Sequence, residues 1–197
     1  MMTGMINMKR KIVVICAIAI CLAIASLGTI AYFTAEDTAT NVITTGGVDI
    51  ELKEMADKGQ DGLVPFEDET GVMPGAEISK IVTVKNTGSA DAYIRIKLEK
   101  SIVLSDEVEA PEGFTPDASL VSYDLNTADW TEKDGYFYYN NSLKAGEETT
   151  PLFTKVSFSV DMDNIYQQST AKIDVKAYAT QVANNGDSAV EAAGWPA

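Results

Sequence analysis

From residue 48 onward, apolar and polar side chains alternate along several short stretches of the chain. A period of two is typical of strands that bury one face and expose the other. The predicted inward residues are Ala92, Ile94, Ile96 and Leu98 in AYIRIKLE, Val156, Phe158 and Val160 in KVSFSV, and Ala171, Ile173, Val175, Ala177 and Ala179 in AKIDVKAYA. Tyr93 and Arg95 are expected on the outer face. One-sided strands of this kind predict antiparallel sheets packed face to face.

Turn-forming residues separate these stretches. Pro74 and Gly75 in MPGAE suit a type II turn, and Asp134-Gly135 before an aromatic stretch predicts a hairpin. Residues 105–129 are polar and are expected to form a long excursion with room for one short helix. The predicted fold class is all-β, with one antiparallel β-sandwich domain over residues 48–182, followed by a flexible C-terminal tail over residues 183–197.

Residues 1–31 have the pattern of a signal peptide. The basic n-region consists of Lys9, Arg10 and Lys11. Residues 12–30 are uncharged and apolar, and Thr29 and Ala31 supply the small residues of a signal peptidase site, so we expect cleavage after Ala31. Because the apolar run is long enough to span a bilayer, an uncleaved N-terminal anchor is the alternative. Residues 12–30 are the only predicted contact with a membrane.

Composition narrows the classes of function. Both cysteines, Cys16 and Cys21, lie inside the apolar run, so the exported chain is predicted to fold without disulfides. After cleavage 12 basic residues face 29 acidic ones, a net charge of −17. Such a charge repels nucleic acid and anionic membrane surfaces. Nucleic acid is therefore excluded as a partner.

The chain contains no histidine. This absence removes the commonest general base, the usual zinc ligand and every Ser-His or Cys-His nucleophile pair. The acidic turns at residues 57–61 and 161–164 lack the full signature of a calcium loop and are interpreted as solvated turns. We therefore expect no enzyme activity, no metal site and no cofactor. Five aromatic residues could stack on sugars, but we favour core packing of alternate ones: Trp130, Tyr136, Phe137, Tyr138 and Tyr139.

Residues 32–45, here called the arm, separate the apolar run from the first alternating stretch. The arm is mostly small and polar, but it contains strand-forming residues. Gly46 and Gly47 after it predict a hinge. The residues predicted to take part in assembly are Tyr32, Phe33, Thr34, Asn41, Val42 and Ile43. The arm either folds back on its own sheet or adds to the exposed edge of a neighbour by β-augmentation, which would produce filaments.

The stretch GTIAYFTAEDTATNVITTGGVDIEL, after a basic n-region and an apolar run, resembles the N-terminus of the TasA/camelysin family of exported Gram-positive proteins. The matching positions are Ala31, Tyr32, Phe33, Asn41, Gly46, Gly47 and residues 48–52. Residues 74–98, residues 134–158 and the stretch VKAYATQVAN resemble strands of the same family. The likeness spans most of the chain.

The resemblance implies a jelly-roll-like sandwich, secretion through a dedicated SipW-type signal peptidase, and self-assembly into biofilm matrix fibres, with an accessory matrix protein as a further partner. In such fibres the arm would complete the sheet of the next subunit, although the acceptor edge is not assigned. The family also carries a surface metallopeptidase activity, but this chain lacks His-Glu-x-x-His. A monomeric, membrane-anchored binding module is the third hypothesis.

Overall fold

The computed structural model describes residues 34–38, 41–42, 47–67, 73–106 and 108–196, with side chains from residue 47 onward. The predicted signal peptide lies outside these residues, as do Tyr32, Phe33, Ile43 and Gly46. Among the described residues no helix is both long and apolar enough to cross a membrane.

The described residues form twelve strands and three short 3₁₀ helices, and every strand pair is antiparallel. The strands are β1 (Thr34–Thr38), β2 (Asn41–Val42), β3 (Ile50–Asp57), β4 (Leu63–Pro65), β5 (Glu77–Ser79), β6 (Ile81–Asn86), β7 (Ala92–Val103), β8 (Val121–Tyr123), β9 (Trp130–Lys133), β10 (Tyr136–Tyr139), β11 (Lys155–Phe158) and β12 (Thr170–Gln181). The 3₁₀ helices are η1 (Gly59–Asp61), η2 (Ala118–Leu120) and η3 (Asn164–Tyr166). The predicted all-β class is confirmed.

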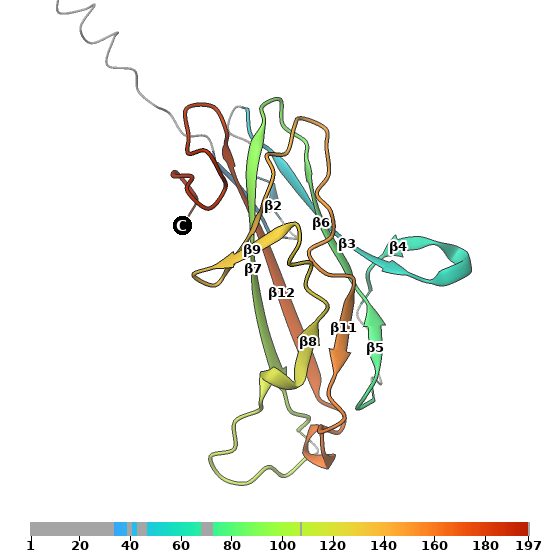
Figure 1. Cartoon of the computed structure of the whole chain (residues 1–197). Coiled ribbons are helices and arrows are strands. Elements are labelled where there is room, and N and C mark those ends of the chain that lie inside the picture. The colour runs from blue at the N-terminus through green and yellow to red at the C-terminus, as the bar shows by residue number, and fades with distance from the viewer. Residues whose placement is uncertain (1–33, 39–40, 43–46, 68–72, 107, 197) are drawn as a thin grey trace, which may run out of the picture. The chain divides into compact units, whose positions relative to one another are not determined.

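The strands form three sheets. The largest has six strands in the order β2-β1-β12-β7-β10-β9, and the other two have the orders β5-β11-β8 and β4-β3-β6. β7 and β12 are the longest strands and pair along their whole length, as Figure 1 shows. The segment that leads into β11 is joined to β6 by backbone hydrogen bonds, in which the amides of Thr149 and Leu152 donate to the carbonyls of Val84 and Val82 at 2.9 Å each.

One hydrophobic core cluster draws residues from all three sheets. It contains Ile94 and Ile96 of β7, Ala177 and Ala179 of β12, Val82 and Val84 of β6, Ile50 of β3 and Val156 of β11. The alternation in β7 and β12 therefore predicted the buried face correctly. In the third alternating stretch, KVSFSV, Val156 is buried as predicted, but Val160 is 77% exposed. β11 ends at Phe158, and the amide of Ser159 turns away to the carbonyl of Leu120, so the alternation stops before Val160 is reached.

Two predicted turns are confirmed. The amide of Ala76 donates to the carbonyl of Met73 at 3.0 Å, and Gly75 has a φ of +78°, as a type II turn requires at its third position. Asp134 and Gly135 both have positive φ, 53° and 77°, and they join β9 to β10 as a two-residue hairpin loop. The excursion over residues 105–129 contains η2, but it also contains β8, which the sequence did not predict.

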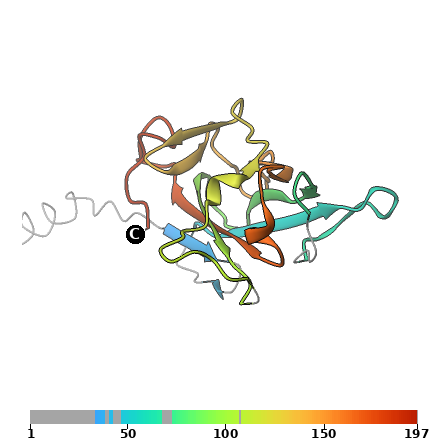
Figure 2. The ribbon, with the colours of Figure 1, turned by 90° about the horizontal axis from the view of Figure 1, so that it is seen from below.

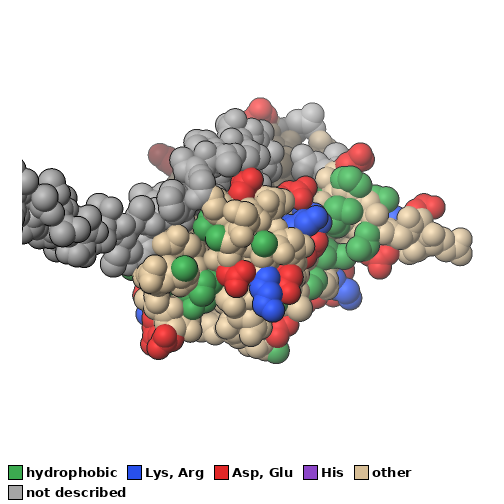
Figure 3. All heavy atoms as spheres, turned by 90° about the horizontal axis from the view of Figure 1, so that it is seen from above, with side chains coloured by type: hydrophobic (Ala, Val, Ile, Leu, Met, Phe, Trp, Pro, Cys, Tyr) green, Lys and Arg blue, Asp and Glu red, His purple; other side chains and the backbone are tan. Residues whose placement is uncertain are grey.

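The hairpin of β3 and β4 projects away from the other strands in Figures 1 and 2. Its tip carries η1 and the exposed side chain of Leu63. On the face drawn in Figure 3, acidic side chains are scattered over the surface, with fewer basic side chains and with hydrophobic ones between them. This distribution agrees with the net charge of −14 of the whole chain.

Candidate assembly edge and the C-terminal segment

The first described strand, β1, lies between β2, the edge strand, and β12 in the domain's own six-stranded sheet. It pairs with β12 from Thr34 opposite Thr180 to Thr38 opposite Lys176. β2 turns back on β1, with Asn41 opposite Thr38. Three of the predicted assembly residues, Thr34, Asn41 and Val42, thus lie in strands, and the other three lie outside the described residues. Of the two arrangements predicted for the arm, β1 has the one that folds back.

β12 offers a longer edge than β1 occupies. On one side, β12 pairs with β7 along its whole length. On the other side, here called its second side, the described pairing is with β1 and covers only residues 176–180. No strand of the described residues pairs with residues 170–175 on that second side. An incompletely paired edge of this kind is a template for a strand from another chain.

The outer face of this edge carries a small charge cluster. The carboxylate of Glu99 on β7 accepts from the ammonium of Lys97 at 2.6 Å and lies 3.5 Å from that of Lys176 on β12. The hydrogen bond from Lys97 and the charge of Lys176 hold the pKa of Glu99 below its usual value. Lys176 is the residue opposite Thr38, so positive charge lies beside the end of β1 in a chain that is otherwise strongly acidic.

Gly47, the described half of the predicted hinge, is held in place. Its φ is +113°, and its carbonyl accepts from the amides of Ser89 at 3.1 Å and Ala90 at 2.8 Å. The carbonyl of Asp49 accepts from the amides of Thr87 and Gly88 at 2.9 and 3.0 Å. The chain is therefore fastened to the turn between β6 and β7 from Gly47 onward, and any swing of the arm must take place before this residue.

Beneath this turn lies Asn86, whose side chain is completely buried. Its Nδ2 donates to the carbonyls of Ala90 and Leu143, both at 2.9 Å, and its Oδ1 accepts from the amide of Gly88 at 3.0 Å. In the sequence, residues 85–91 (KNTGSAD) are a cluster of turn-forming residues between two strands, which predicts only a polar turn here. The spacing Asn86-x-Gly88 at the end of a strand was the one available signal, since asparagine side chains bind a backbone amide two residues on.

The C-terminal segment, residues 182–196, packs on the outer face of the six-stranded sheet, whereas a loose tail was expected. The amide of Val182 donates to the carbonyl of Asp91 at 3.0 Å, and the hydroxyl of Tyr93 donates to that of Gly186 at 2.9 Å. Ala189 is buried in a second hydrophobic cluster together with Tyr93 and Tyr138. The segment covers large side chains that the alternation had assigned to solvent.

Arg95 is at the centre of this cover and is only 9% exposed. Its guanidinium carbon lies 3.9 Å from the ring centre of Tyr136, 4.8 Å from that of Trp195 and 5.2 Å from that of Tyr178. Its Nη2 donates to the carbonyl of Pro196 at 2.9 Å, while its Nε is buried without a hydrogen-bond partner among the described residues. The charge is therefore stabilised mainly by aromatic faces.

The aromatic residues divide between the two faces, as the alternation predicts. Trp130 and Tyr139 are buried in the main core with their ring centres 5.1 Å apart, and Phe137 packs against the same core. Tyr136 and Tyr138 lie on the outer face beneath the C-terminal segment. Within the described residues they are covered surface and not an open platform for a sugar.

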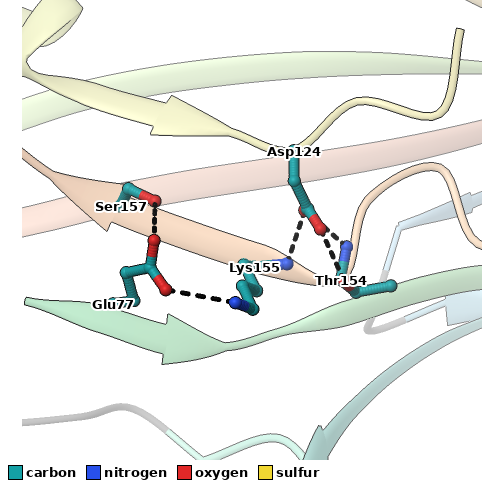
Figure 4. A network of polar contacts seen from close by, with 5 residues as sticks. All are labelled: Glu77, Asp124, Thr154, Lys155 and Ser157. Carbon is teal, nitrogen blue, oxygen red and sulfur yellow. Dashed lines mark hydrogen bonds and ion pairs between the residues drawn. The ribbon is translucent and has the colours of Figure 1, made fainter.

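Figure 4 shows the polar network that ties β5, β11 and the loop after β8 together. Glu77 contacts the ammonium of Lys155 at 3.1 Å and the hydroxyl of Ser157 at 3.4 Å. Asp124 accepts from the amide of Lys155 at 2.6 Å and from the hydroxyl and amide of Thr154 at 2.5 and 2.8 Å. Burial raises the pKa of Asp124, but these hydrogen bonds outweigh it and hold the pKa below its usual value. The network therefore links β5, β11 and the loop after β8 by hydrogen bonds and one ion pair.

The two acidic turns use carboxylates to cap their own backbone. Asp57 accepts from the amide of Gly59 at 2.8 Å, and Asp163 accepts from that of Ile165 at 3.0 Å. In the described part of the chain no three histidine, cysteine, aspartate or glutamate side chains are grouped so that they could hold a metal ion.

Comparisons of the chain with protein-family models, with curated proteins and with solved structures find no match. The resemblance to the TasA/camelysin family therefore stays a prediction that rests on the residues of this chain.

Proposed function

We propose that this protein is a secreted structural subunit of an extracellular biofilm matrix fibre, and that subunits join by exchange of the N-terminal arm. The acceptor is the edge of β12 at residues 176–180, with residues 170–175 as its extension. The domain is a jelly-roll-like β-sandwich, a proposal supported by the single core cluster that draws on all three sheets.

The pairing of β1 with β12 is the observation that carries this proposal. Backbone hydrogen bonds between strands do not depend on which chain supplies the strand. The β1 segment of a second copy can therefore make the same pairs with β12 that the chain makes with itself. Because the donor and acceptor surfaces differ, each subunit can accept one arm and donate another, and the contact extends into a filament.

The position of Gly47 supports an exchange that leaves the domain intact. From this residue onward the chain is fixed to the turn at residues 86–90 by four backbone hydrogen bonds. Removal of β1 from its own sheet would therefore break the pairs along residues 34–38 without disturbing the bonds that hold residues 47–49.

The test uses cysteine substitutions in the exported chain from residue 32, which has no cysteine of its own. Thr38 and Lys176 are direct partners across an antiparallel pair, in which Cα atoms are about 4.5–5.5 Å apart. A disulfide spans about 4.4–6.8 Å, so the introduced thiols can form one. The double variant Thr38→Cys/Lys176→Cys, oxidised as a monomer, should be locked and form no fibres until it is reduced.

The matched experiment mixes the two single variants, Thr38→Cys and Lys176→Cys, before assembly. If the arm pairs in trans at the same register, oxidised fibres should contain disulfide-linked pairs with one copy of each variant. Fibres that form normally from the oxidised double variant would contradict the exchange of β1. Fibres that never form from the unsubstituted chain would contradict the fibre function itself.

Intact mass of the exported protein separates the remaining alternatives. A chain that starts at Tyr32 and forms filaments in electron micrographs is the expected result. A chain that retains residues 1–31 and stays monomeric would instead favour the membrane-anchored module.

A further inference from the structure

We propose that the C-terminal segment, residues 182–196, is a clamp that holds the arm-accepting edge of β12 in register, so that docking of this segment and binding of the arm are coupled. The consequence for fibres rests on the proposed function, but the coupling itself is a property of the single chain.

Thr180 makes the most direct connection between the two segments. Its backbone is opposite Thr34 in the pairing of β1 with β12. Its side chain is completely buried, and its hydroxyl donates to the carbonyl of Ala193 at 3.2 Å and accepts from the Nδ2 of Asn185 at 3.4 Å. A single residue thus binds the arm through its main chain and the C-terminal segment through its side chain.

Tyr178 makes a second, indirect connection. It is opposite Glu36 of β1, and its ring meets that of Tyr136 edge-on at 5.9 Å. The guanidinium carbon of Arg95 lies 5.2 Å from the ring centre of Tyr178 and 4.8 Å from that of Trp195. Tyr178 and Thr180 are both paired with the arm through their backbones. Their side chains therefore lie on the outer face of β12, in the layer that includes the C-terminal segment.

Asn185 fastens the segment to the end of β12. Its Nδ2 donates to the carbonyls of Gln181 at 2.9 Å and Ala193 at 3.1 Å. Its Oδ1 accepts from the amides of Gly186 at 2.9 Å and Ala193 at 2.8 Å. One side chain therefore holds both ends of the loop against the strand end that receives Thr34.

The inner face of β12 offers little support where the arm binds. Its buried core residues between positions 176 and 180 are the alanines Ala177 and Ala179, whereas β7 places Ile94 and Ile96 opposite them. Alanine buries little apolar area, and the free energy gained by burial scales with that area. The outer face, with Tyr178 and Thr180 beneath the clamp, therefore supplies a large share of the packing that keeps this edge straight.

Coupling of this kind is reciprocal. Release of the clamp should weaken binding of the arm to β12, and loss of the arm should loosen the clamp. Both directions can be followed by amide hydrogen exchange in the full exported chain, because exchange reports local opening segment by segment.

The test compares Trp195→Ala and Thr180→Val with Phe114→Ala. Thr180→Val replaces the hydroxyl with a methyl group and keeps a β-branched strand residue, so it preserves the fold if the larger change does not. Phe114 packs edge-on against Tyr166 of η3 with ring centres 6.1 Å apart, outside the clamp, and its substitution also removes an aromatic ring. Both clamp variants should speed exchange at residues 34–38 and 176–180 at least about fivefold, with no change at Val82 and Val84 and none in either segment for Phe114→Ala.

A result in which residues 183–196 exchange faster while residues 34–38 and 176–180 keep their protection would overturn the proposal. The deletion of residues 32–45 tests the reverse direction, with faster exchange expected at the amides of Gly186 and Ala193. These readouts need no fibres. Failure of the fibre function therefore shows separately, as a lack of sedimenting material from the unsubstituted chain.

Discussion

The side-chain amide of Asn86 donates to the carbonyl of Leu143 at 2.9 Å, although the two residues are 57 positions apart and both are buried. The same side chain also holds Ala90 and Gly88. It thereby joins the end of β6, the turn that fixes Gly47 and the loop that follows β10. A polar group at such a junction stabilises a fold only while all of its partners are satisfied.

Asn86→Leu should lower the free energy of unfolding by about 3 kcal/mol, because the three hydrogen bonds of a completely buried side chain would be lost at once. Urea unfolding with an unchanged m value would measure this loss. The control is Asn140→Leu, in which the amide is exposed and the expected loss is below about 1 kcal/mol. Equal losses in the two variants would contradict the role of Asn86 as a buried hub.

The elements predicted correctly were those that local chemistry determines. Alternation identified the buried faces of β7 and β12, and Asp134-Gly135 identified a hairpin because few residue pairs accept positive φ at both positions. The burial of the outer face could not be predicted from neighbouring residues in the sequence. Arg95 alternates like an exposed residue, and only the segment about a hundred positions later, at Trp195 and Pro196, removes it from water.

The candidate site was less predictable for the same reason. The arm has too few apolar residues to favour one sheet, so the sequence left its pairing open, and its position beside β12 comes from long-range backbone contacts. Asn86 was counted as one polar residue in a turn cluster. Its burial depends on Leu143 and Gly88, which no pattern along the chain brings together.

Gly88→Ala should destabilise the anchor of the arm. A Cβ atom at this position would lie 2.6 Å from the amide nitrogen of Asp49 and 2.7 Å from the carbonyl oxygen of Gly47, so the backbone must move. The expected loss is about 2 kcal/mol of unfolding free energy, with faster exchange at the amides of Ser89 and Ala90. At Gly113 a Cβ meets no atom within 4 Å, and Gly113→Ala should cost about 1 kcal/mol through its positive φ alone.

Replacement by methionine should destabilise the protein by different amounts at Lys80 and at Glu54. The ammonium of Lys80 is nearly buried, lies 2.8 Å from the carboxylate of Glu54 and 3.9 Å from the ring centre of Phe66. Glu54→Met would leave a buried charge without its partner and should cost about 2–3 kcal/mol. Lys80→Met would remove the charge and leave a carboxylate that water reaches, at a cost of about 1 kcal/mol or less. Thermal unfolding of both variants would reveal the order, and the reverse order would contradict it.

Asp124 should make the protein sensitive to acid. Its folded-state pKa lies below the value of about 3.9 for an unfolded aspartate, so its contribution to stability is complete above that pH and is lost as the pH falls through the folded-state pKa. Asp124→Asn should therefore be less stable than the unsubstituted protein at neutral pH, by about 1 kcal/mol because the side chain is exposed. The difference should shrink as the pH is lowered below about 4.

Urea unfolding along a pH series would follow this difference, with Glu112→Gln as the control. Glu112 is an exposed carboxylate in the loop between β7 and η2, and its substitution should change stability by less than about 0.5 kcal/mol at every pH. A constant difference between Asp124→Asn and the unsubstituted protein across the series would mean that the shape of the side chain, and not its charge, holds Thr154 and Lys155. The network in Figure 4 would then be a packing contact, since only an ionised carboxylate gives hydrogen bonds whose strength disappears with protonation.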